Sequence, residues 1–99
     1  MDISVSYDNS TALVAINGDL DTTTSPEFET LIAPVFEQAS TIIFDFTNVG
    51  YISSSGLRIM LVSQRKALAN GGSLKLRNLN ETVRDVFEIS GFVTLLDIE

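Results

Sequence analysis

The sequence predicts an α/β domain in which helices pack on a largely parallel sheet. Apolar periodicity alternates between strand and helix patterns, turn residues separate the segments, and a length of 99 residues suits one domain. The expected element order is ββαβαβαβ, and such alternation favours parallel strands joined by crossover helices. We therefore expect a single domain over residues 1–99 with a mixed, mostly parallel sheet.

The first half of the chain predicts a hairpin and a third strand. Residues 3–7 alternate apolar and polar side chains, as a half-buried strand does. A turn cluster, Asp8-Asn9-Ser10, leads into a second strand over residues 11–17. Residues 42–46 are mostly apolar, which predicts a strand buried on both faces.

A helix is expected between the second and third strands. Thr24 and Glu27 have the spacing of a capping box at its start. Pro34 lacks an amide donor and crowds the preceding turn, so a kink or an early end is expected there. The face turned to the core is expected to hold Phe28, Leu31, Ile32, Val35 and Ala39.

The second half predicts a long helix over residues 54–69, ended by Asn70-Gly71-Gly72. A strand over residues 73–77 follows, then a helix capped by Asn80 and ended by Gly91. Residues 94–98 predict a last strand. On a helical wheel the long helix is expected to turn Leu57, Met60, Leu61, Gln64 and Leu68 to the core.

Composition excludes several functional classes. The chain has no cysteine and no histidine, which removes thiolate chemistry, the commonest general base and the usual metal ligands. We expect no enzyme activity, metal or cofactor. A net charge of −7 argues against nucleic acid, whose phosphates need clustered bases. The longest apolar run, residues 12–16, cannot span a bilayer, and no basic leader is visible, so a cytoplasmic protein without membrane insertion is expected.

Three serines and a glycine, Ser53-Ser54-Ser55-Gly56, open the long helix. One serine is explained as an N-cap, because its oxygen satisfies a free backbone donor. Two further hydroxyls at the positive end of a helix also suit an anion or phosphorylation site. Gly56 removes a side chain there and lets another backbone or a phosphate approach.

Four segments resemble the landmarks of the STAS domain, and more narrowly of the bacterial anti-sigma factor antagonists. They are Gly18-Asp19-Leu20-Asp21, Asp45-Phe46, the run from Tyr51 to Arg58, and the run from Val83 to Phe92. The likeness covers nearly the whole chain in order. The family fold, a sheet with helices packed on it and a switch site at a helix N-terminus, agrees with the elements expected above.

The resemblance implies a partner switch. The unphosphorylated antagonist binds an anti-sigma factor that is also a serine kinase, phosphorylation of the antagonist releases it, and a PP2C-type phosphatase resets the switch. In the family pattern an Asp precedes the acceptor serine, and a Ser or Thr and then Gly follow. The acceptor is therefore Ser54, although Ser53 replaces the family's Asp, and Ser53 or Ser55 are the alternatives.

A partner-binding patch is expected beside the serines. On the wheel Arg58, Ile59, Val62 and Lys66 lie away from the core face; scattered surface apolar residues are the alternative explanation. Arg58, four residues after Ser54, could reach a phosphate on it.

Other acids have weaker interpretations. Asp19 and Asp21 could share a face of an extended segment, but turn and capping roles fit better than catalysis. The resemblance also ties this segment to partner or nucleotide contact, so Asp21 is a secondary candidate. Asp45 either orients the switch loop or ends its strand. An alternative function is a free-standing STAS subunit that regulates a lipid or anion transport system.

Overall fold

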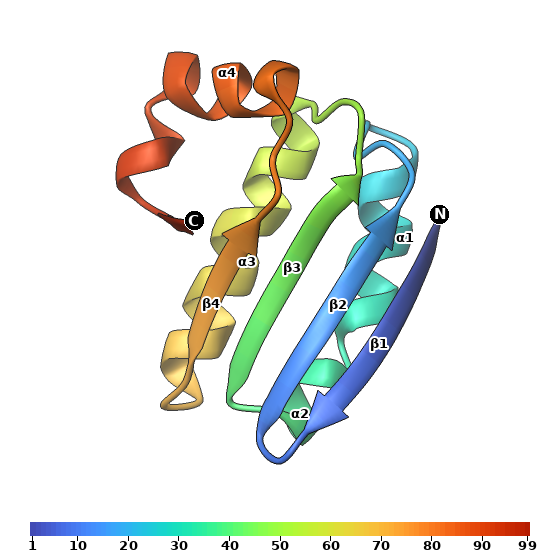
Figure 1. The fold of residues 1–99 in the computed structure, drawn as a ribbon, viewed down its shortest axis with the longest axis vertical. Helices are drawn as coiled ribbons and strands as arrows, with labels where there is room; N and C mark the ends of the chain where they lie inside the picture. The colour runs from blue at the N-terminus through green and yellow to red at the C-terminus, as the bar shows by residue number, and fades with distance from the viewer.

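The chain forms a five-stranded sheet, and the alternating burial along its strands shows that helices cover one face of it. The computed structural model describes all 99 residues (Figure 1). The spatial order of the strands is β1-β2-β3-β4-β5; β1 pairs antiparallel with β2, and every other neighbouring pair is parallel. The elements are β1 (Asp2–Asp8), β2 (Thr11–Asn17), α1 (Thr24–Ile32), α2 (Val35–Gln38), β3 (Thr41–Asn48), α3 (Ser54–Ala69), β4 (Ser73–Arg77), α4 (Glu81–Ser90), the 3-10 helix η1 (Phe92–Thr94) and β5 (Asp97–Ile98). The predicted fold class and element order are confirmed.

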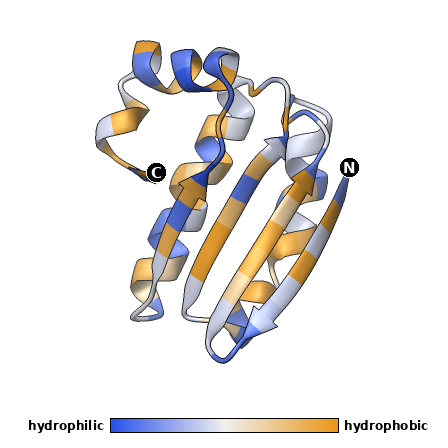
Figure 2. Cartoon of the chain, viewed as in Figure 1, coloured by the Kyte–Doolittle hydropathy of each residue, from blue (hydrophilic) through white to orange (hydrophobic).

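Helices α1 and α3 lie side by side on one face of the sheet, and α4 crosses near the carboxyl ends of the parallel strands (Figure 1). Every second residue of β2, and of β3 as far as Phe46, is fully buried against these helices, and the residues between them are half-buried. Figure 2 shows the hydrophobic colouring concentrated along these two strands. The expectation that residues 42–46 are buried on both faces is therefore wrong, because Ile43 and Asp45 face the uncovered side.

The core lies between the sheet and the helices and contains 23 apolar residues in one cluster. Phe28 of α1 meets Phe44 of β3 edge to face, with ring centroids 5.3 Å apart. Phe46 of β3 meets Phe87 of α4 in the same way at 6.3 Å. Such aromatic pairs contribute about 0.5–1.5 kcal/mol beyond their buried area, so they fix how α1 and α4 sit on the sheet.

Several helix ends follow the prediction. Pro34 separates α1 from α2, as a residue without an amide donor should. Asn80 caps α4 by accepting from the Val83 amide at 2.8 Å, and Gly91 ends it with a positive φ of 80°. The last strand is shorter than expected, because residues 92–94 form η1 and only residues 97 and 98 pair with β4.

The expected capping box of Thr24 and Glu27 is wrong. The reciprocal bonds form three residues earlier: the Asp21 carboxylate accepts from the Thr24 amide at 2.9 Å, and the Thr24 hydroxyl accepts from the Asp21 amide at 3.0 Å. The Asp21 carboxylate also accepts from the Thr23 amide at 2.9 Å. Asp21 therefore caps the turn that leads into α1, since a carboxylate is a stronger acceptor than a hydroxyl.

The buried face of α3 differs from the predicted one. Leu57 and Met60 are buried as expected, but Leu68 is 59% exposed and Leu61 is only half-buried. The helix is turned so that Ile59, expected to face solvent, is 2% exposed. The reason is that α3 packs against α1 as well as the sheet, which widens its buried arc toward α1. The residues of α3 that are buried are Gly56, Leu57, Ile59, Met60, Ser63 and Ala67.

Candidate functional site

The serine run lies at the amino end of α3, near the carboxyl ends of β2 and β3 (Figure 1). Ser53 has extended backbone angles (φ −94°, ψ 176°), and its hydroxyl accepts a long bond of 3.4 Å from the Gly56 amide. Its carbonyl accepts the first intrahelical bond, from the Leu57 amide at 2.9 Å. Ser53 is therefore the N-cap, and its hydroxyl is occupied in capping the start of the helix.

The other two serines have no such task. Ser54 is the first helical residue and is exposed, and Ser55 is half-buried. Neither hydroxyl makes a hydrogen bond within the chain. The first amides of a helix lack intrahelical acceptors, so the start of α3 favours negative charge. Ser54 is exposed to solvent at this position.

A short parallel bridge fixes the chain just before the serines. The Leu20 amide donates to the Tyr51 carbonyl at 3.0 Å, and the Ser53 amide donates to the Leu20 carbonyl at 2.8 Å. Because Asp21 follows Leu20 and Ser54 follows Ser53, the bridge sets the start of α1 beside the start of α3. The landmark segment around Asp21 is thus a neighbour of the serine run.

Gly56 allows this contact. A Cβ at position 56 would lie 2.6 Å from Cγ1 of Ile52 and 2.9 Å from the carbonyl oxygen of Leu20. Both distances are shorter than real Cβ atoms show. The sequence suggested that a backbone or a phosphate could approach here. The backbone of Leu20 does, and Gly56 is buried, so it shapes the loop and does not present a surface to a partner.

Side chains from both neighbouring loops hold the β3–α3 loop. The Asp19 carboxylate, from the β2–α1 loop, accepts from the Gly50 amide at 3.0 Å. The Asn80 side-chain amide, from the β4–α4 loop, donates to the Val49 carbonyl at 3.1 Å. Together with the Leu20 bridge these bonds form a clasp, and the serine run starts from a backbone fixed on two sides.

Two carboxylates of this region have lowered pKa values. The Thr24 amide is the main cause at Asp21, where it holds the pKa below the ordinary value of 3.8; the Thr23 amide and Thr24 hydroxyl add to it and outweigh desolvation. At Asp45 burial raises the pKa, but hydrogen bonds from the Thr47 hydroxyl and amide and from the Asn78 side chain lower it by more. The pKa of Asp45 therefore lies below its ordinary value. Asp45 therefore fixes the end of β3 to the β4–α4 loop and makes no bond to the serines.

A sequence model of the STAS domain matches residues 2–99. The chain belongs to the STAS domain family. This confirms the resemblance seen in its landmarks.

Relatives of this STAS domain include anti-sigma factor antagonists. The anti-sigma-B factor antagonist of Bacillus subtilis (strain 168) is 29% identical over 98 residues, which cover 99% of this chain and 90% of that protein. The solved structure of the anti-sigma factor antagonist SpoIIAA in its unphosphorylated form has a TM-score of 0.81 at 25% identity, covering 99% of this chain and 88% of that one. The phosphorylated form of the Bacillus cell fate determinant SpoIIAA shares the fold, with a TM-score of 0.73 at 24% identity over 99% of this chain and 91% of that one.

The residues predicted to flank the serines separate into two groups. Arg58 is exposed one turn after Ser54, and Val62 is half-buried one turn further. Ile59 is in the core, so its place in the predicted surface patch is wrong. Arg58 makes no ion pair with a carboxylate of this chain, so its guanidinium is free to bind a ligand.

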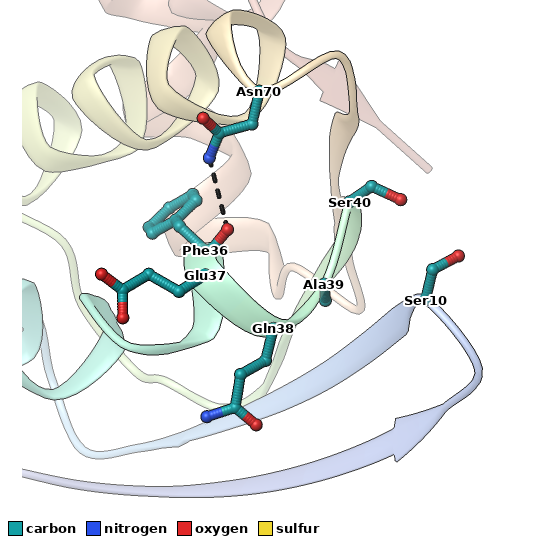
Figure 3. A pocket seen from close by; sticks show the side chains of 7 residues that line it. All are labelled: Ser10, Phe36, Glu37, Gln38, Ala39, Ser40 and Asn70. Carbon is teal, nitrogen blue, oxygen red and sulfur yellow. Dashed lines mark hydrogen bonds between the residues drawn. The ribbon is translucent and has the colours of Figure 1, made fainter.

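Other features lie away from this site or add no chemistry. No three acids gather where they could hold a metal ion. The one open pocket lies at the opposite end of the domain, between α2, the end of α3 and the β1–β2 turn (Figure 3). Asn70 crosses it to donate to the Phe36 carbonyl at 3.3 Å. None of the helices is long and apolar enough to cross a membrane.

Sequence reasoning missed the clasp residues. The sequence predicts a turn or capping role for Asp19 and a cap for Asn80, and the resemblance ties the segment of Asp19 and Leu20 to partner or nucleotide contact; none of these predicts bonds to the β3–α3 loop. Each acts on a residue about thirty positions away. One signal was present: polar residues that follow neighbouring parallel strands meet at the same edge of a sheet.

Proposed function

We propose that the chain is an anti-sigma factor antagonist that works by a partner switch at Ser54. The unmodified chain binds an anti-sigma factor that is also a serine kinase, and this kinase phosphorylates Ser54. Phosphorylation weakens binding so that the partner is released, and a PP2C-type phosphatase restores the unmodified form. The named relatives and the two forms of SpoIIAA support this proposal.

The observation that carries the proposal is the division of labour within the serine run. Ser53 caps the helix, Ser55 is half-buried, and Ser54 is the exposed serine whose hydroxyl has no partner in the chain. A kinase needs a hydroxyl that it can reach without unfolding the helix. The clasp presents Ser54 on fixed backbone, so a partner can recognise its surroundings as a rigid surface.

A phosphate on Ser54 would sit in a favourable field. It adds about −1.5 to −2 charges, and the helix amino end favours a negative group there by about 0.3–1 kcal/mol when exposed. The guanidinium of Arg58, four residues on and unpaired, is the cation placed to donate to it. The folded domain therefore tolerates the modification without rearrangement.

The same phosphate would oppose partner binding. A dianion inside an interface must lose water, and it repels acidic groups opposite it. A loss of about 2.7 kcal/mol is enough for a hundredfold weaker complex. The surface of this chain on which the phosphate would act is the serine run with its exposed and half-buried neighbours. Its residues are Asp21, Ser53, Ser55, Arg58 and Val62.

Phosphate mapping tests the proposal. The chain is incubated with ATP and each serine-kinase anti-sigma factor encoded in its own genome, and modified residues are located by mass spectrometry. We expect one phosphate, on Ser54, and none in Ser54→Ala. Ser55→Ala is the matched control and should still be phosphorylated. Phosphate on Ser53 or Ser55 alone, or none with any of these kinases, would contradict the proposal.

A further inference from the structure

The solvent face of α3 carries a line of alternating basic and leucine side chains. Arg58, Leu61, Arg65 and Leu68 are spaced by three, four and three residues, so they follow one side of the helix. Both arginines are exposed, Leu61 is half-buried and Leu68 is 59% exposed. We refer to these four residues as the α3 stripe. Ser54 lies one turn before its first member.

A second exposed leucine adjoins the stripe. The Gln64 side-chain amide donates to the carbonyl of Leu95 at 3.3 Å, which holds the segment after η1 against the middle of α3. Leu95 is 55% exposed. Gln64 lies between the turns that carry Leu61 and Leu68, so this bond brings the backbone of a second exposed leucine next to the stripe.

The basic residues of α3 are not neutralised within the chain. The ion pairs of the structure involve the terminal amine, Lys75 and Arg77, and none involves Arg58, Arg65 or Lys66. This is notable because 13 acids face only 6 bases in the sequence. Lys66 lies on the flank of the helix, 5.8 Å from the centre of the Phe36 ring. Uncompensated positive charge on an acidic protein is thus gathered on α3.

We propose that the α3 stripe and Leu95 form a docking surface for an acidic segment of the anti-sigma factor that also carries apolar side chains. This rests on the proposed function and extends its contact from the serine run along the helix. Charge complementarity selects the occupant: a partner acid meets attraction at Arg58 and Arg65 but repulsion from most of the rest of the surface. The exposed leucines supply the apolar contact that slows dissociation.

The length of α3 separates this surface from the direct effect of phosphorylation. At about 1.5 Å per residue, Arg58 lies about 6 Å from Ser54 along the helix axis, Arg65 about 16 Å and Leu68 about 21 Å. Charges in solution are screened over about 8 Å at physiological salt. A phosphate on Ser54 therefore changes the field at Arg58 but hardly at Arg65. Arg65 and Leu68 should contribute equally to binding of the modified and unmodified forms.

The test measures the dissociation constant for the anti-sigma factor that binds the unmodified chain, with Arg65→Glu and Leu68→Asp introduced separately. Each should weaken binding about tenfold, and by the same factor when Ser54 is phosphorylated. Ile89→Asp is the matched control: Ile89 is 88% exposed and belongs to α4, not to the stripe on α3, and its replacement should change the constant less than twofold. Circular dichroism checks that each variant is folded, and Leu95→Ser replaces Leu68→Asp if the latter unfolds.

The outcomes separate the two proposals. Tenfold losses in the stripe variants with an unchanged control support the docking surface. Normal binding by Arg65→Glu and by the folded leucine variant overturns it and leaves the switch at Ser54 intact. Losses in the control as large as those in the stripe variants would also overturn it, since they would show no preference for this face. Failure of the unmodified chain to bind any anti-sigma factor of its own genome would overturn both proposals.

Discussion

Replacing Gly56 by alanine tests the packing that positions the serine run. The added Cβ would lie 2.6 Å from Cγ1 of Ile52 and 2.9 Å from the Leu20 carbonyl oxygen. The Ile52 side chain can rotate in part, but the Leu20 oxygen belongs to the backbone that accepts from the Ser53 amide. Relief of the clash must therefore move α3 away from the Leu20 bridge.

The expected cost follows from two opposing effects. Alanine is better than glycine inside a helix by up to about 1 kcal/mol. Overpacking of a buried position costs about 1–3 kcal/mol, and a backbone contact belongs at the upper end of that range. The net loss in unfolding free energy should be about 1–2 kcal/mol. For a domain of this size that corresponds to a melting temperature lower by roughly 5–15 °C.

Urea unfolding followed by far-ultraviolet circular dichroism measures this loss. Gly50→Ala is the matched control, because a Cβ at position 50 meets only one atom, a carboxylate oxygen of Asp19 at 3.2 Å, which can shift. It should cost less than about 0.5 kcal/mol, in the range of ordinary surface substitutions. If Gly56→Ala were as stable as the parent chain, α3 would not be seated on the Leu20 backbone and the argument would fail.

Two further predictions concern the core and the acid range. Ile59→Asp should unfold the domain, because loss of a buried isoleucine costs about 2–5 kcal/mol and an unpaired charge adds more, whereas Val62→Asp should cost much less, because Val62 is only half-buried. Equal curves for the two variants would refute the assigned rotation of α3. The lowered pKa values of Asp21 and Asp45 mean that the folded state favours both carboxylates, so their contribution to stability is complete above pH 3.8 and is lost as the pH falls through the lower folded values. Urea midpoints at about pH 3 and pH 6 should differ less in Asp21→Asn than in the parent; an equal difference would contradict the hydrogen-bond assignment.

Local signals explain why much of the fold was predictable. The break at Pro34, the cap at Asn80 and the end at Gly91 each depend on one residue acting on its own few neighbours. The bounds of α3 depend on a serine before the helix and a glycine pair after it. Backbone chemistry of this kind is visible in a short window of sequence.

Tertiary context explains the errors. Ile59 was placed outside because a helical wheel shows periodicity but not how many partners surround a helix, and α3 has both the sheet and α1. The cap of α1 was misplaced because Asp21 and Thr24 both offer good acceptors and only the three-dimensional turn selects the carboxylate. The clasp through Asp19 and Asn80 joins loops from separate strands, and no local pattern shows which loops meet.

Comparing the binding of the unmodified and the Ser54-phosphorylated chain to one anti-sigma factor tests the central claim most directly. Isothermal titration at physiological salt gives both dissociation constants, with each form purified and its phosphate position verified. A partner switch at this exposed helix start predicts that the phosphorylated form binds at least a hundredfold more weakly while its melting temperature stays within a few degrees. Equal affinity of the two forms would contradict the switch.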